Sequence, residues 1–124
     1  MNLQRALRIA VLLAAMAAFA LAADVTGTWT ATFDTQVGKQ EYTYVFKQEG
    51  TKLTGKAVSV LAKAETPITE GSVNGDDITF VEELNYEGMP LHITYKGKIS
   101  GNEIKFVRNM ADIAMEEATA KKSK

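Results

Sequence analysis

The segment EGSVNGDDITF at residues 70–80 returns 26 positions later as KGKISGNEIKF at residues 96–106. The copies pair Gly71 with Gly97, Gly75 with Gly101, Ile78 with Ile104 and Phe80 with Phe106. Each copy ends a strand, turns tightly and begins the next strand, because glycine and asparagine adopt the positive φ that hairpin turns require. The repeat indicates either a regular meander of hairpins or the turn pattern that any β-hairpin protein reuses.

The chain from residue 25 onward keeps this alternation, with apolar residues at every second position, as in strands with one buried face. We expect strands at residues 25–34, 42–46, 52–60, 67–73, 77–85, 89–98 and 103–109. Because only short turns join them, neighbouring strands must be antiparallel. The fold class is therefore predicted as all-β, an antiparallel up-and-down meander closing into a small barrel of about eight strands.

Two stretches are ambiguous. Residues 57–65 fit a short helix as well as a strand end, and residues 111–120 are rich in good helix formers. We favour a closing strand at residues 114–121, because seven strands would leave the first strand unpaired. Residues 121–124, Lys-Lys-Ser-Lys, are expected to form a frayed, solvated basic tail.

The N-terminus has the layout of a secretory signal peptide. Arg5 and Arg8 precede an apolar run from residue 9 to residue 23 that ends in small residues. This run is shorter than the roughly 20 residues that a membrane-spanning helix needs, although a retained anchor is the alternative. We expect a signal peptide at residues 1–23, one barrel domain at residues 24–124, and a secreted or periplasmic protein with no stable membrane insertion after cleavage.

Composition narrows the function classes. A formal net charge of −1 gives no electrostatic case for nucleic acid. The chain has no cysteine and one histidine, so it lacks thiolate chemistry and two-histidine sites. No phosphate-binding loop or metal-ligand cluster is found, and we expect neither a cofactor nor a metal.

Two charges fall on apolar faces. Glu82 continues the inward face of Ile78 and Phe80, and Arg108, which lies 26 positions later, occupies the equivalent place in the second copy. Buried charges are costly unless paired, so they form a structural pair, contact a polar ligand or reach water at the barrel mouth. Glu70 is expected at a rim, and His92 on the exposed face of its strand.

Aromatic residues also crowd the inward faces. An eight-stranded barrel is either packed solid or holds one small ligand, and the small inward residues Ala31, Gly55 and Ala57 favour space on one side. The candidate ligand-binding residues are Trp29, Tyr42, Tyr44, Glu82, Tyr95 and Arg108.

The tripeptide Gly27-Thr28-Trp29 resembles the first strand of calycins, the superfamily of lipocalins, fatty-acid-binding proteins and avidins. In lipocalins a late-strand arginine packs across this tryptophan, a role that the resemblance would give to Arg108. Residues 46–55 and 71–80 are similar to motifs of small exported bacterial barrel proteins of unknown function, which implies export and a barrel but no catalytic residues.

We therefore expect a non-enzymatic barrel that binds a small or partly apolar ligand at its mouth. The alternative is a filled barrel that contacts a protein or glycan through its surface, such as its threonine-rich outer face. A second alternative is an acid/base hydrolase that uses Glu82 with Glu70 or Arg108, since glycoside cleavage needs two facing carboxyl groups.

Overall fold

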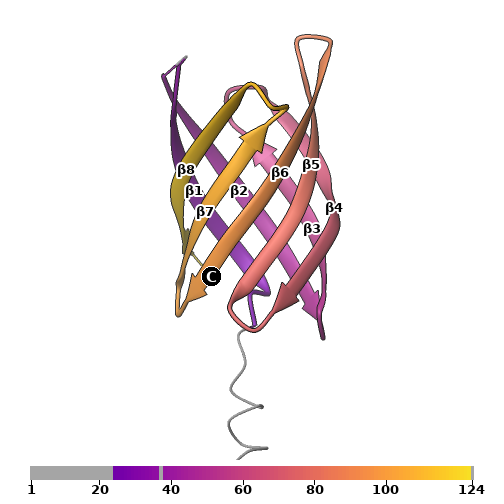
Figure 1. The fold of residues 1–124 in the computed structure, drawn as a ribbon, viewed down its shortest axis with the longest axis vertical. Coiled ribbons are helices and arrows are strands. Elements are labelled where there is room, and N and C mark those ends of the chain that lie inside the picture. Colours follow the sequence, from indigo (N-terminus) through magenta and orange to yellow (C-terminus); the bar gives the residue numbers. More distant parts are fainter. Residues whose placement is uncertain (1–23, 37, 124) are drawn as a thin grey trace, which may run out of the picture.

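The computed structural model describes residues 24–36 and 38–123. The predicted signal peptide lies outside the described residues. Eight strands follow one another: β1 (Gly27–Thr35), β2 (Gly38–Glu49), β3 (Lys52–Ser59), β4 (Ala64–Asn74), β5 (Asp77–Tyr86), β6 (Met89–Ser100), β7 (Glu103–Met110) and β8 (Ala114–Lys122). Each strand pairs antiparallel with the next, and β8 returns to β1 to close the barrel (Figure 1). The predicted fold class is confirmed.

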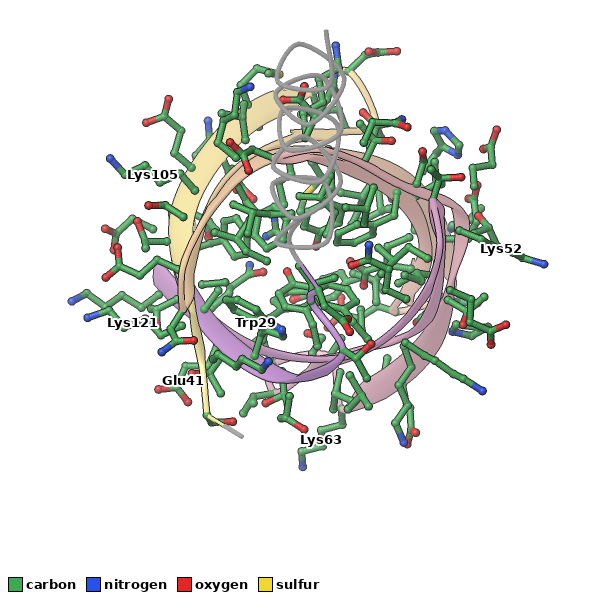
Figure 2. All side chains as sticks on the ribbon, turned by 90° about the horizontal axis from the view of Figure 1, so that it is seen from below. Trp29, Glu41, Lys52, Lys63, Lys105 and Lys121 are labelled. Atoms are coloured by element: carbon green, nitrogen blue, oxygen red, sulfur yellow. The ribbon has the colours of Figure 1, made fainter. Side chains whose placement is uncertain are left out.

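The strands alternate between the interior and solvent because their side chains have a period of two. In β5, for example, Ile78, Phe80, Glu82 and Leu84 are buried. Seen along the barrel, side chains fill the ring of strands: Trp29 lies inside it, whereas Lys52, Lys105 and Lys121 point outward (Figure 2). The two copies of the sequence repeat form the β4–β5 and β6–β7 hairpins.

The two ends of the barrel differ. At the turn end, the β2–β3, β4–β5 and β6–β7 hairpins turn through glycines with φ near 60°, including Gly75 and Gly101. At the other end, which we call the loop end, the β3–β4, β5–β6 and β7–β8 connections place non-glycine residues in the left-handed region, namely Lys63, Glu87, Ala111 and Asp112. Left-handed backbone is disfavoured for such residues, so the loop end carries local strain that the turn end avoids.

The N-terminal segment covers the turn end. The Trp29 Nε1 group donates a hydrogen bond to the Val25 carbonyl (2.9 Å), and the Val25 amide donates to Gln48 Oε1 (3.0 Å). Val25 and Trp29 are both buried. This end is therefore plugged by the chain itself, so the mouth expected from the sequence corresponds to the loop end.

The ambiguous stretches are resolved as strands and turns. The alternative of a helix over residues 57–65 is wrong, because β3 continues to Ser59 and β4 begins at Ala64. The expected closing strand is confirmed as β8. The frayed tail is wrong for residues 121–123, because Lys122 donates to the Asn102 carbonyl and Ser123 to the Thr28 carbonyl; Lys124 lies outside the described residues.

The seam between β1 and β8 joins fewer residue pairs than any other pair of neighbouring strands in the barrel. Its paired residues are Trp29 with Lys122 and Thr30 with Lys121. By contrast, β1 pairs with β2 over nine residue pairs. Of all the strand pairs, this one alone joins the two ends of the described chain.

Candidate functional site

A connected polar network lies inside the barrel, in its loop-end half. Tyr42 of β2 lies opposite Ser59, the last residue of β3, and Glu116 is the third residue of β8. Glu82 and Arg108 come from β5 and β7, as their period-two positions predict. Both side chains are 0% exposed, so the alternative that they reach water at the mouth is wrong in this structure.

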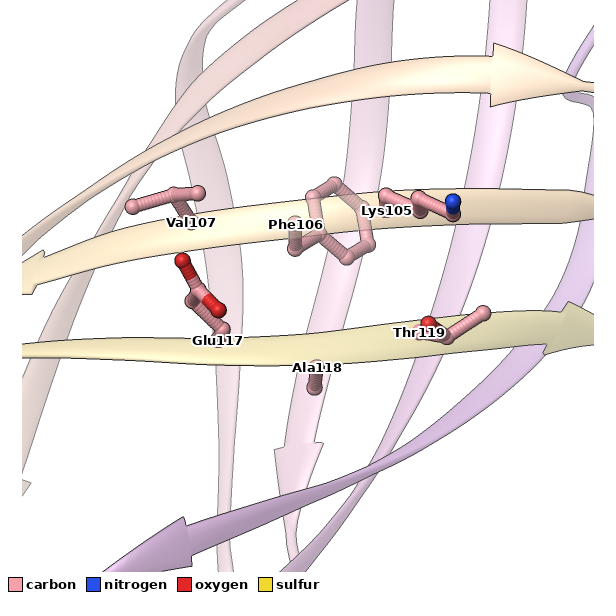
Figure 3. Close-up of a pocket in the computed structure, with 6 residues that line it drawn as sticks. All are labelled: Lys105, Phe106, Val107, Glu117, Ala118 and Thr119. Carbon is pink, nitrogen blue, oxygen red and sulfur yellow. The ribbon is translucent and has the colours of Figure 1, made fainter.

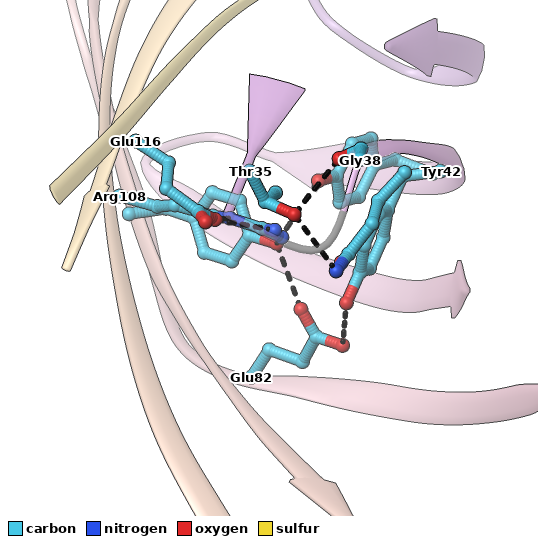
Figure 4. Close-up of polar contacts among 9 residues, drawn as sticks. Thr35, Gly38, Tyr42, Glu82, Arg108 and Glu116 are labelled. Carbon is cyan, nitrogen blue, oxygen red and sulfur yellow. Dashed lines mark hydrogen bonds and ion pairs between the residues drawn. The ribbon is translucent and has the colours of Figure 1, made fainter. Parts of the chain in front are cut away.

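Tyr95 joins the two charges. Its hydroxyl donates to Glu82 Oε1 (2.7 Å) and accepts from Arg108 Nη1 (3.0 Å) and from the Tyr44 hydroxyl (3.0 Å). The Tyr42 hydroxyl donates to the other oxygen of Glu82 at 3.3 Å (Figure 4). Glu82 and Arg108 are thus linked through a shared phenol.

The direct partner of Arg108 is Glu116. Arg108 Nε donates to Glu116 Oε1 (2.7 Å), and Nη2 lies 2.7 Å from the same oxygen (Figure 4). Glu116 is 8% exposed, so this is a buried ion pair. Sequence analysis missed Glu116, although it shares the inward face of β8 with Ala118 and Ala120 at period two.

Aromatic rings enclose the network. The Arg108 guanidinium lies 3.8 Å from the centre of the Phe33 ring and 4.8 Å from that of Tyr42. The lipocalin-like contact of Arg108 with Trp29 is wrong: the cation over the Trp29 ring is Lys122, whose Nζ is 5.9 Å from its centre. Trp29 lies towards the plugged end, and the other five candidates lie together in the network.

Burial controls the protonation of these groups. Burial raises the pKa of the Glu82 carboxyl above its ordinary value, although the Tyr95 hydroxyl and Arg108 oppose the shift. Burial also raises the pKa of Tyr42 to about 12, and those of Tyr44 and Tyr95 well above the ordinary value. The tyrosines therefore remain hydrogen-bond donors at neutral pH.

The interior is filled. All six candidate side chains are exposed by 1% or less. Gly55 does not open space, because a Cβ there would lie 1.9 Å from the Val45 carbonyl oxygen; the expectation of room at this position is wrong. A ligand at the mouth must therefore lie over the network or displace its side chains.

Two hollows lie on the outer wall of the barrel. One of about 460 Å³ sits between β7 and β8 (Figure 3), and its lining residues are Lys105, Phe106, Val107, Glu117, Ala118 and Thr119. Another of about 250 Å³ lies over the β1–β8 seam, with Thr30, Ala31, Thr32, Thr119 and Lys121 around it. Both are shallow depressions between strands.

The other candidate catalytic residues do not lie together in one site. Glu70 is exposed at a break in the β4–β5 register, whereas Glu82 is inside the barrel, so the two carboxylates share no cleft. His92 is exposed, as expected, and pairs with Glu83 on the outer wall. Within residues 24–36 and 38–123, no cluster of three or more potential metal ligands is found, and no helix is long and apolar enough to cross a membrane.

The closed meander of eight antiparallel strands is an up-and-down β-barrel. It is similar to the crystal structure of a mutant of the fluorescent protein UnaG, with a TM-score of 0.52 and 13% sequence identity, over 80% of this chain and 96% of that one. No protein-family model matches the chain. No curated protein matches it either.

Proposed function

We propose that the protein is exported and acts as a non-enzymatic barrel that binds a small, partly apolar ligand at the loop end. The observation that carries this proposal is the apolar rim: Val60, Leu61, Met89 and Ile113 are exposed large hydrophobic residues at the tips of three loop-end connections. Exposed apolar side chains on successive connections at one end of the barrel can together contact a partly apolar ligand. The polar network lies beneath this rim as the floor of the site.

The similarity to a fluorescent protein supports a calycin-type scaffold. The first 23 residues, with two arginines before an apolar run, support export. A ligand-binding barrel scaffold and an export signal together fit a binding protein that acts outside the cytoplasm.

Native mass spectrometry tests the proposal on protein produced from the full sequence in an exporting host. We expect a retained or added small-molecule mass on the wild-type protein and its loss in the rim variant Leu61→Ser/Ile113→Ser. Val45→Ser is the matched control, because Val45 is an exposed apolar residue on the outer wall of β2. If the rim variant and Val45→Ser retain the small-molecule mass equally, the ligand does not bind at the rim.

A second candidate function is contact with a protein or glycan through the outer wall. The filled interior favours it, together with the threonine-lined hollow over the β1–β8 seam. A wild-type protein that carries no small molecule, but loses a glycan or protein contact in Thr30→Ala/Thr119→Ala, would support this candidate over the first.

A further inference from the structure

The loop end carries most of the negative charge of the barrel. Its connections and the four adjoining residues of each strand hold eight carboxylates and four cationic side chains, a formal charge of −4. The acidic residues are Asp34, Glu41, Glu65, Glu83, Glu87, Asp112, Glu116 and Glu117, and the basic ones are Lys39, Lys56, Lys63 and Arg108. The turn end, counted the same way with Asp24, holds five carboxylates and six lysines, a formal charge of +1.

The apolar rim sits within this negative field. Ile113 is 74% exposed and adjoins Asp112, and Met89 follows Glu87 by two residues (Figure 1 shows these connections at the upper end). Apolar contact and negative potential are thus offered by the same loops. A ligand matched to both has an apolar body and a positive charge.

The polar network beneath the rim also favours a positively charged ligand. Among the described residues, Arg108 is the buried cation, and its Nε and Nη2 groups already face Glu116. Glu82 is a second buried carboxylate whose contacts are phenol hydroxyls rather than a direct cation. The network thus holds two buried carboxyl groups against one guanidinium, which favours a cationic over an anionic head group above it.

We infer that the ligand of the loop end is a cationic amphiphile, an apolar chain with an ammonium-type head group. This inference rests on the proposed ligand site at the mouth. It adds the charge and the chemical class of the ligand to that site.

The test compares three probes with the same decyl chain: decyltrimethylammonium, decyl sulfate and decyl maltoside, each below its micellar concentration. NMR titration of the protein, produced from the full sequence and purified from the exporting host, reports both the affinity and the place of contact. We expect the ammonium probe to bind at least tenfold more tightly than the sulfate probe. This preference should shrink at high salt, because exposed charges are then screened.

Charge variants locate the effect. Two charges about 8 Å from the head group each change the affinity about twofold in water, so Glu87→Gln/Asp112→Asn should weaken ammonium binding about fourfold at low salt. The matched control Asp76→Asn/Glu103→Gln removes two charges from the turn end and should leave the affinity nearly unchanged.

The outcomes separate the two proposals. Equal affinity for the three probes at the loop end, or tighter binding of the sulfate, overturns the cationic class and keeps the mouth site. Equal weakening by the two double variants also overturns the inference, because the preference would then come from net charge alone. Failure of all three probes to perturb the loop end overturns the proposed function itself.

Discussion

The buried ion pair between Arg108 and Glu116 makes a sharp prediction about stability. Replacement of Arg108 by Met removes the bonds from Nε to Glu116 and from Nη1 to Tyr95. It also leaves Glu116, at 8% exposure, without its cation. Breaking a buried pair from one side costs about 3–5 kcal/mol, because an uncompensated charge remains in the interior.

The double variant Arg108→Met/Glu116→Leu should recover most of this loss. Replacement of both partners by apolar groups of similar volume is often neutral or stabilising. We therefore expect the double variant to be more stable than the single variant by about 2 kcal/mol or more. The remaining cost comes from the Tyr95 hydroxyl, which loses one donor.

Urea unfolding measures both variants, with the fluorescence of Trp29, the single tryptophan, as the signal. For a domain of this size, the loss in Arg108→Met corresponds to a fall in the midpoint on the order of 2 M urea. Lys47→Met is the control, because Lys47 and Glu49 form an exposed pair at 3.2 Å that should contribute little. Equal destabilisation in the single and double variants would refute the reasoning, since the cost would then come from lost packing rather than a stranded carboxylate.

Three further predictions follow from the interior. Burial raises the pKa of Glu82 above its unfolded value of 4.5, so its contribution to stability is present below that pH and is lost as the pH rises through the folded value. Glu82→Gln should therefore gain stability relative to wild type between about pH 4 and about pH 8 in paired urea titrations, and an unchanged difference would contradict this. Burial raises the pKa of Tyr42 to about 12 and those of Tyr44 and Tyr95 well above the ordinary value of a tyrosine. Absorbance at about 295 nm should show these three tyrosines un-ionised at about pH 11 until the barrel unfolds, and early ionisation would show that solvent reaches the network. Gly55→Ala should cost more than about 3 kcal/mol by thermal or urea unfolding, since its φ is +140° and the Val45 carbonyl occupies the Cβ position, whereas Gly50→Ala, with open space, should cost about 1–2 kcal/mol.

The strands were predictable because their signal is local. Period-two alternation and glycine turns lie within a dozen residues of one another, as the β4–β5 and β6–β7 hairpins show. The same periodicity correctly placed Glu82 and Arg108 inside. Closure by β8 was also predictable, because an unpaired β1 edge would be costly.

Contacts across the barrel were not predictable, because they depend on the stagger of the strands rather than on sequence spacing. Arg108 therefore lies over Phe33 instead of Trp29. Glu116 was missed because alanines and glutamates in β8 fit a helix as well as a strand. The filled interior depends on summed volumes and on close backbone approaches such as that at Gly55, which no periodicity reveals.

The short β1–β8 seam has a consequence for how the barrel forms. Its residue pairs, such as Thr30 with Lys121, join positions about 90 residues apart, whereas the hairpins join neighbours. Closing so long a loop is entropically costly, and contacts of this range slow folding. We therefore expect the meander to assemble first as an open, curved sheet and the seam to close last. During that interval β1 and β8 are free edges, and the two lysines that β8 contributes to the seam, at positions 121 and 122, protect the open sheet from pairing with another chain.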